Sequence, residues 1–396
     1  MILSSMQFTS VLPTQIIFGM NVVKNRLAEE IRHLGAKKVL LVTDSGLMAT
    51  GLVGQVVENL VSAQIEVVTF SEVEPNPTPE AVVKGTELFV KHHCDLLVAL
   101  GGGSSMDAAK SIAVSSKNPG DILDYRRGGK TVQGPLPPLI AIPTTAGTGS
   151  EVTAVSVLSD HETKRKYTVA SPYIYPKIAF VDPTMTLSLP KRQIVATGMD
   201  ALVHAIETFT SNRSQPISDA LALQAMKMIR EYLPASYAVP TNLEAKAQVM
   251  LASTIAGLAF SMSGTALVHS ISRAVTSWFG VPHGIANAVL LPYVIQYNLI
   301  AQIDKYAEIA RIFNEDLRSI NKYKAAEKLV DEVRSFTQQL DIPNDFGYLN
   351  VQMTDQMFEE IAAATMDDRG TLPNNPRKPS LDEVIQLYKK VFPQKG

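Results

Sequence analysis

The first half of the chain alternates short apolar runs with segments of helical periodicity. The run K-K-V-L-L-V-T at 37–43 is continuous and rich in β-branched residues, as expected for a strand that is buried on both faces. Helical spacing follows at 51–61 and 80–92, and further apolar runs lie at 65–70, 95–100, 139–142 and 178–181. Strands that alternate with helices favour an α/β fold, with a parallel sheet covered by helices on both faces.

The second half differs from the first in composition and periodicity. From Lys191 onward the chain is rich in Ala, Met, Leu and Gln, with helical periodicity and few strand-like runs. Asp182-Pro183 marks a plausible boundary. We therefore predict an α/β dinucleotide-binding domain over 1–184 and an all-α, metal-binding domain over 185–396, with the functional site in the cleft between them.

Composition excludes several classes of partner. The 396 residues carry a net charge of −2 and no basic block, so we expect no nucleic-acid partner. The single cysteine, Cys94, excludes an internal disulfide and is compatible with a reducing compartment. The N-terminus is a poor signal peptide, and no apolar run reaches the roughly 18 residues of a membrane helix. We expect a soluble cytoplasmic protein.

Two loops have the composition of phosphate-binding sites. G-G-G-S-S-M-D at 101–107 follows an apolar run and opens a helical segment, and its exposed amides would favour a phosphate. It is not the usual G-x-G-x-x-G, and a plain strand-to-helix turn is the alternative. P-T-T-A-G-T-G-S-E at 143–151 also follows an apolar run, and its hydroxyl groups suit phosphate or ribose oxygens; the alternative is a capped loop. Because two loops of this composition follow successive predicted strands, chance is a weaker explanation of their composition than phosphate binding.

Asp44 follows the 37–43 run directly. A carboxylate there is suited to binding an adenosine ribose diol and to repelling a 2′-phosphate, which favours NAD over NADP. The alternative is that Asp44 caps the helix that begins at D-S-G-L. Further along, E-P-N-P-T at 74–78 predicts a turn.

Four residues have the chemistry of a metal site. Asp200 and His204 are four apart in a helical segment, so their side chains project from one face, and His269 and His283 offer two more imidazoles. One carboxylate and three imidazoles suit Fe²⁺ or Zn²⁺ and leave the ion able to polarise a substrate oxygen. Each histidine alone is more often a hydrogen-bonded core or loop residue, so the inference depends on the set.

These motifs together identify a family. The chain resembles the iron-containing (group III) alcohol dehydrogenases nearly from end to end. The resemblance is carried by Q-I-I-F-G at 15–19, V-T-D at 42–44, the two loops above, A-F-V-D-P at 179–183, G-M-D-A-L-V-H-A-I-E at 198–207, P-H-G-I-A-N-A-V-L-L-P at 282–292 and N-P-R at 375–377.

The resemblance implies an activity and a set of site residues. It implies a metal-dependent NAD(H) alcohol dehydrogenase or aldehyde reductase with one divalent ion, often a homodimer. Hydride would pass between the nicotinamide and a small alcohol or aldehyde. The implied metal ligands are Asp200, His204, His269 and His283. The implied cofactor-binding residues are Asp44, Gly102, Gly103, Ser104, Asp107, Thr144, Thr145, Thr148 and Lys166.

One position departs from the family pattern. The family usually carries a further histidine, assigned to proton transfer, four residues after the third ligand, and here that residue is Arg273. Arginine is a poor proton shuttle but offers a fork matched to anionic oxygens. We count Arg273 among the candidate catalytic residues and hypothesise a substrate with an anionic head, such as sulfoacetaldehyde, phosphonoacetaldehyde or a semialdehyde acid. The alternative is that Arg273 pairs with a protein carboxylate or with the cofactor pyrophosphate.

Other readings of the site remain open. A plain short-chain alcohol or diol dehydrogenase would use Phe260 and Val155 as an apolar pocket wall. A dehydroquinate synthase-like lyase would also combine NAD with a metal, but without net redox. A nucleotide- and metal-binding sensor would bind NADH without turning over.

Overall fold

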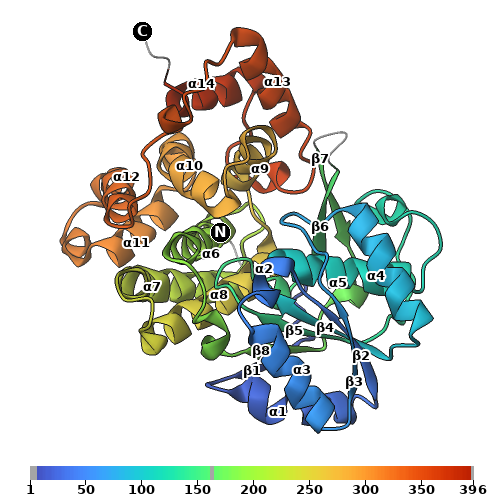
Figure 1. Cartoon of the computed structure of the whole chain (residues 1–396). Coiled ribbons are helices and arrows are strands. Elements are labelled where there is room, and N and C mark those ends of the chain that lie inside the picture. The colour runs from blue at the N-terminus through green and yellow to red at the C-terminus, as the bar shows by residue number, and fades with distance from the viewer. Residues whose placement is uncertain (1–6, 161–164, 394–396) are drawn as a thin grey trace. The chain divides into compact units, whose positions relative to one another are not determined.

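The computed structural model describes residues 7–160 and 165–393 (Figure 1). Contacts divide the chain into two compact units that are described separately. One consists of Thr14–Gly198 and Ala235–Gly257, and the other of Met1–Pro13, Met199–Pro234 and Leu258–Gly396. These units interleave along the sequence, whereas the predicted boundary after residue 184 is a single cut, and that boundary stays a prediction.

The first unit contains a six-stranded parallel sheet (Figure 1). Its strands are, in spatial order, β1 (Gln15–Phe18), β8 (Ile178–Val181), β5 (Leu139–Pro143), β4 (Leu96–Gly101), β2 (Lys38–Val42) and β3 (Glu66–Phe70). Every pairing is parallel. The parallel sheet is therefore confirmed, with β1 as an edge strand that the apolar runs did not predict.

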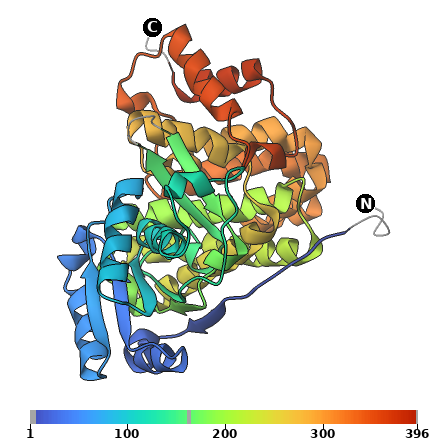
Figure 2. The same cartoon turned by 90° about the vertical axis from the view of Figure 1, so that its right-hand side faces the viewer.

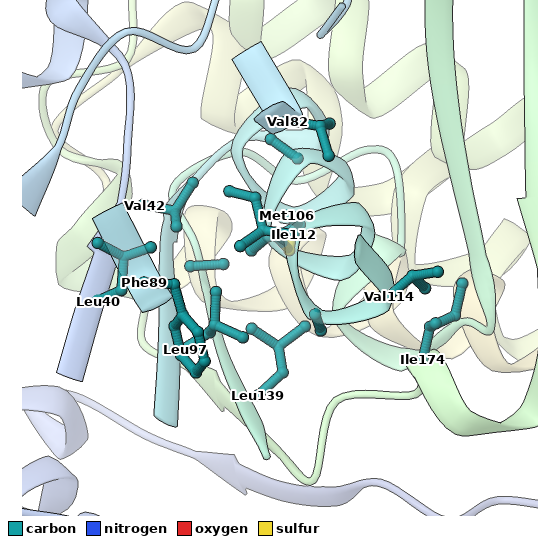
Figure 3. Packing of buried hydrophobic residues seen from close by; sticks show 14 of the residues in the cluster. Leu40, Val42, Val82, Phe89, Leu97, Met106, Ile112, Val114, Leu139 and Ile174 are labelled. Atoms are coloured by element: carbon teal, nitrogen blue, oxygen red, sulfur yellow. The ribbon is translucent and has the colours of Figure 1, made fainter. Parts of the chain in front are cut away.

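Helices cover both faces of this sheet, because successive strand residues point to opposite sides. Leu40 and Val42 belong to a core shared with helices α4 (Pro79–Lys91) and α5 (Gly103–Ser115), which Figure 3 shows from close by. Val39 and Leu41 face the opposite way, into a core shared with α1 (Val22–His33) and α3 (Leu52–Ser62). This double burial explains why the strands read as continuous apolar runs.

The sheet order contains a topological switch point. After β2 the chain moves outward to β3, and after β4 it moves the other way to β5, although β2 and β4 are neighbours. The loops that follow β2 and β4 therefore diverge at one edge of the sheet, which is where dinucleotides bind in folds of this kind. Asp44 opens the first loop, before the short helix α2 (Ser45–Met48), and the glycine cluster forms the second.

A small antiparallel hairpin adds two strands that the sequence did not predict. Strands β6 (Val155–Asp160) and β7 (Arg165–Ala170) pair from Val155 with Ala170 to Asp160 with Arg165. The hairpin follows the second phosphate-type loop directly and carries Lys166 on β7.

The second half of the chain is largely helical, as predicted (Figures 1 and 2). Its helices are α6 (Lys191–Thr210), α7 (Pro216–Ala238), α8 (Leu243–Ser263), α9 (Leu267–Phe279), α10 (His283–Asn298), α11 (Ile303–Phe313), α12 (Lys322–Gln339), α13 (Asp355–Met366) and α14 (Leu381–Val391).

Two of these helical stretches bear on the expectation that the chain has no membrane helix. Leu243–Ser263 and His283–Ala301 are long and apolar enough to cross a membrane by length and composition alone. Neither is a continuous apolar run, because small and polar residues interrupt each of them. In the structure 56% and 67% of the two windows are buried, which is how the core helices of a globular protein also appear.

Candidate metal centre and dinucleotide-binding loops

The two phosphate-type loops lie against each other within the sheet-containing unit. Gly101 pairs in register with Pro143, so the loops leave adjacent strands at the same edge. A Cβ added to Gly103 would lie 2.8 Å from Thr148 Cγ2, and one on Gly102 would lie 3.4 Å from Thr145 Cγ2. Only glycine permits this approach at Gly103, because contacts under 3 Å force neighbouring atoms to move. The structure thus brings together residues that the sequence placed in separate motifs.

The Ser104 hydroxyl is tied to the hairpin through a residue that the sequence analysis read only as part of a turn. The backbone N–H of Asn76 donates to Ser104 Oγ (3.2 Å), and Lys166 Nζ donates to the side-chain oxygen of Asn76, Oδ1 (2.9 Å). Asn76 has a positive φ of 61°, a conformation that asparagine tolerates better than most residues. Lys166 therefore reaches the glycine loop from β7, although 62 residues separate it from Ser104 in the chain.

Asp44 caps a helix, as the alternative reading proposed. Its Oδ1 accepts a hydrogen bond from the Leu47 amide at 2.9 Å, at the start of α2. A Cβ on Gly101 would lie 3.5 Å from Asp44 Oδ2, so the carboxylate also borders the glycine cluster. The ribose-binding role of Asp44 stays a prediction.

A buried polar network that the sequence analysis missed fixes the second loop. Lys110 is fully buried, and its Nζ donates to Ser150 Oγ (2.7 Å), to Thr153 Oγ1 (3.2 Å) and to the Val155 carbonyl (2.8 Å). Asp107 accepts from Ser150 Oγ (2.7 Å) and from the Val157 amide (2.9 Å). Both carboxylate oxygens of Asp107 thus hold the loop and the hairpin, and a direct cofactor contact of Asp107 stays a prediction.

Burial shapes the electrostatics of this network. It lowers the pKa of Lys110 to about 8, although Asp107 and Glu151 act in the opposite direction. It also raises the pKa of Asp107, which Lys110 and the hydrogen bonds from Val157 and Ser150 oppose. The two groups therefore stabilise each other's charge in a site that penalises both.

The four predicted metal ligands lie in the second unit, and three of them, Asp200, His269 and His283, form one compact cluster. Asp200 and His204 lie on α6, His269 lies on α9, and His283 begins α10. Asp200 Oδ1 lies 3.5 Å from His269 Nε2, 3.9 Å from His283 Nε2 and 3.9 Å from His204 Nε2. One ligand atom from each of Asp200, His269 and His283 lies within 4.8 Å of the others.

These separations suit a divalent cation. Two ligands bonded at about 2.1 Å in a tetrahedron lie about 3.4 Å apart, close to the observed spacing. Burial raises the pKa of Asp200, but the three histidines outweigh it and bring that pKa well below its usual range, so the carboxylate is ionised. Burial lowers the pKa of His269, but Glu207 and Asp200 raise it to about 9. The donor set thus has the chemistry of a metal centre, while its assignment as the ligand set stays a prediction.

Aromatic stacking supports the imidazoles. The ring of Phe260, at the end of α8, stacks on His204 with centroids 4.4 Å apart and planes inclined by 24°. His204 stacks in turn on His269, with centroids 4.5 Å apart. Phe260 thus positions a predicted ligand, and its role in a substrate pocket stays a prediction.

Two buried residues around the ligands were not predicted. Glu207 Oε2 lies 2.6 Å from His269 Nδ1, and Asn287 Nδ2 donates to Asp200 Oδ1 at 2.7 Å. A signal for both exists in the motifs: Glu207 lies seven residues after Asp200 on α6, and Asn287 lies four after His283 on α10. Each therefore shares a helix face with a ligand.

Arg273 has a protein partner. It lies one turn after His269 on α9, and its Nη1 lies 3.3 Å from Asp368 Oδ2. Asp368 also accepts from the amides of Gly370 (2.8 Å) and Thr371 (3.1 Å). Burial raises the pKa of Asp368, but Arg273 and these hydrogen bonds bring it below its usual range. The pairing of Arg273 with a protein carboxylate, the alternative reading, is therefore observed.

Known proteins match nearly the whole chain. Residues 13–183 match the family described as iron-containing alcohol dehydrogenase, and residues 194–392 match its C-terminal domain family. The NAD-dependent methanol dehydrogenase of Bacillus methanolicus is 38% identical over 96% of this chain and 99% of its own length. The 1,3-propanediol dehydrogenase of Citrobacter freundii is 38% identical over 98% and 100%. The sulfoacetaldehyde reductase of Bilophila wadsworthia (strain 3_1_6) is 33% identical over 98% and 100%.

Solved structures share the fold at comparable identity. A crystal structure of a 1,3-propanediol oxidoreductase aligns with a TM-score of 0.93 at 37% identity and covers 98% of this chain and 100% of that one. The sulfoacetaldehyde reductase of Bifidobacterium kashiwanohense, solved in complex with NAD⁺, aligns with a TM-score of 0.89 at 31% identity, covering 99% and 100%.

Proposed function

This chain belongs to the iron-containing alcohol dehydrogenase family, and from that premise we propose that it interconverts a short, uncharged aldehyde and its alcohol at a metal centre held by Asp200, His204, His269 and His283. It is an NAD-dependent oxidoreductase that acts on CH–OH groups.

One observation carries the assignment of the metal centre. Asp200 Oδ1 lies within 3.9 Å of an imidazole nitrogen of three histidines, which come from α6, α9 and α10, and Asp200, His204 and His269 are each less than 10% exposed. A carboxylate oxygen and imidazole nitrogens gathered in this way are donors suited to a divalent cation. When bound, Fe²⁺ or Zn²⁺ supplies a positive charge that polarises the substrate oxygen.

The cofactor role follows from the switch point. We assign the pyrophosphate to the backbone of Gly102 and Gly103 at the start of α5, where the helix amides favour an anion. NAD(H) supplies the hydride chemistry when bound. Thr145 and Thr148 lie against these glycines, and Lys110 holds the loop that carries them.

The Arg273–Asp368 pair argues for an uncharged substrate. An anionic head group would have to compete with the Asp368 carboxylate, which two backbone amides hold in place. Like charges brought close together in a partly buried site repel each other strongly. We therefore favour the short-chain alcohol or diol that the sequence analysis kept as its alternative.

One observation keeps the anionic substrate as a second candidate. The contact of Arg273 with Asp368 is a single one through Nη1, at 3.3 Å, so it is not the bidentate fork that would occupy the guanidinium more fully. The Arg273 side chain is also 25% exposed. A sulfonate-bearing aldehyde is thus the sharpest competitor to test against propanal.

The test is a panel of kcat/KM values for NADH oxidation by metal-reconstituted protein. Wild type is expected to prefer propanal and 3-hydroxypropanal to sulfoacetaldehyde, and Arg273→Ala to change the three values by similar factors. If sulfoacetaldehyde is preferred, and Arg273→Ala loses roughly 10- to 100-fold on that substrate alone, the anionic substrate is correct and ours is wrong.

Asp368→Asn provides the matched variant. It removes the negative charge but keeps the size of the side chain, so it is expected to improve kcat/KM for sulfoacetaldehyde relative to propanal. The homodimer implied by the family and the cytoplasmic location expected from the composition stay predictions, and sedimentation measures the first.

A further inference from the structure

Glu207 occupies an unusual place beside the metal centre. It lies on α6, three residues after His204, and is 4% exposed. Its Oε2 lies 2.6 Å from His269 Nδ1 and accepts from the Ala266 amide at 2.8 Å, while Oε1 accepts from the Val268 amide at 2.5 Å. One buried carboxylate therefore contacts a predicted ligand and the backbone that presents it.

The backbone contacts replace a missing helix cap. Helix α9 begins at Leu267, and its N-cap residue, Ala266, makes no side-chain cap hydrogen bond. The first amides of a helix need acceptors, and a negative charge there is favourable. Glu207 supplies both the acceptors and the negative charge. Because Glu207 lies on α6 with Asp200 and His204, this contact fixes the start of α9 relative to those two residues.

The contact with the ring has a chemical consequence. A carboxylate beside Nδ1 favours the tautomer that carries its proton there, which leaves the Nε2 lone pair for a metal. His269 Nε2 is the nitrogen that lies 3.5 Å from Asp200 Oδ1. Acceptors of this kind behind a ligating histidine fix the orientation of its ring and raise its basicity.

We propose that Glu207 is a positioning residue of the metal centre. It sets the tautomer and the orientation of the His269 ring, and it also caps α9. This inference rests on the proposed function, because it takes Asp200 and His269 as ligands. It predicts that Glu207 contributes to metal affinity without touching the ion.

The experiment measures the Zn²⁺ dissociation constant of the full chain by competition with a chelating dye. Glu207→Gln keeps the size and one acceptor oxygen, but it removes the charge that favours the Nδ1–H tautomer. We expect Zn²⁺ binding to weaken by roughly 10- to 100-fold. The absorption spectrum of the Co²⁺-substituted protein should also change, and the Kd for NADH should stay within a factor of about two of wild type.

A matched variant separates positioning from general loss of a cap. Glu383 accepts from the Ser380 amide at 2.9 Å at the start of α14 and also pairs with Arg377, so Glu383→Gln removes a capping charge at a more exposed site on another helix. It should leave Zn²⁺ affinity unchanged. Equal weakening in both Glu variants, or wild-type Zn²⁺ affinity in Glu207→Gln, overturns the inference.

An Asp200→Asn arm distinguishes failure of this inference from failure of the proposed function. If Asp200→Asn binds Zn²⁺ as wild type does, the assignment of the metal centre is wrong. If Asp200→Asn loses Zn²⁺ but Glu207→Gln does not, the metal centre stands and only the positioning role fails.

Discussion

Replacing Lys110 by Met should loosen the second phosphate-type loop, because one ammonium group holds that loop in place. Its Nζ donates to Ser150, to Thr153 and to the carbonyl of Val155, and it lies 4.0 Å from Asp107 Oδ1. Methionine fills much of the same space but donates nothing. The substitution therefore leaves a carboxylate and several acceptors buried without their partner.

The expected magnitude comes from two opposing effects. Removing one partner of a buried ion pair costs about 3–5 kcal/mol of unfolding free energy. The fall in the pKa of Lys110 from 10.5 to about 8 shows that the native site already penalises the charge. At about 1.4 kcal/mol per pKa unit that penalty is roughly 3 kcal/mol, and Met does not pay it. Subtracting that penalty from the cost of breaking the pair leaves a net destabilisation of about 0–2 kcal/mol.

The assays are urea unfolding and NADH titration. We expect a lower urea midpoint and a Kd for NADH weaker by roughly tenfold, because the loop carries Thr145 and Thr148. Lys117→Met is the control, since it makes the same change at an exposed position just after α5. If Lys110→Met matches Lys117→Met in both assays, the network does not hold the loop.

Three further predictions concern the same unit. The folded pKa of Lys110, about 8, lies below its ordinary 10.5, so between these pH values the unfolded chain binds more protons than the folded chain. The contribution of Lys110 to stability should therefore rise from pH 8 to pH 10.5, which urea midpoints across that window measure. If the midpoint of Lys110→Met changes with pH as steeply as that of wild type, the prediction is wrong. Gly103→Ala places a Cβ 2.8 Å from Thr148 Cγ2 and should weaken NADH binding in a titration. A double variant that adds Thr148→Ser should recover part of the affinity. If Gly103→Ala binds NADH as wild type does, the loops do not pack as described. Thr254→Val removes the donor to buried Glu151 Oε1 (2.8 Å) and should cost about 1–3 kcal/mol in urea unfolding, whereas an unchanged midpoint shows that the bond contributes nothing.

The sheet was predictable where both of its faces are covered. The run at 37–43 became β2 (Lys38–Val42) because burial on both faces demands continuous apolar residues. Strand β1 has only four residues and three of them are exposed, so it gave no such signal. Strand β7, R-K-Y-T-V-A, mixes charged and polar residues for the same reason, since only Val169 is buried in it.

The site was predictable where residues share a helix face or a loop, and not where tertiary contacts supply a partner. Spacing related Asp200 to His204, and the ligand chemistry of His269 and His283, together with the family resemblance, joined them to the set. The partner of Arg273, in contrast, is Asp368, which lies 95 residues away in sequence. The spacing of residues along the sequence cannot predict this contact, because it forms only when α9 packs near the loop after α13.

The central claim is that Asp200, His204, His269 and His283 hold one divalent cation that turnover requires. The most direct measurement compares bound metal per chain with NADH oxidation for wild type and for Asp200→Ala, before and after chelation and reloading. The account predicts one ion per wild-type chain, loss of ion and turnover together on chelation, recovery of both on reloading, and neither in Asp200→Ala. Wild-type turnover by a chain stripped of its ion, or a full equivalent of tightly bound ion in Asp200→Ala, would contradict it.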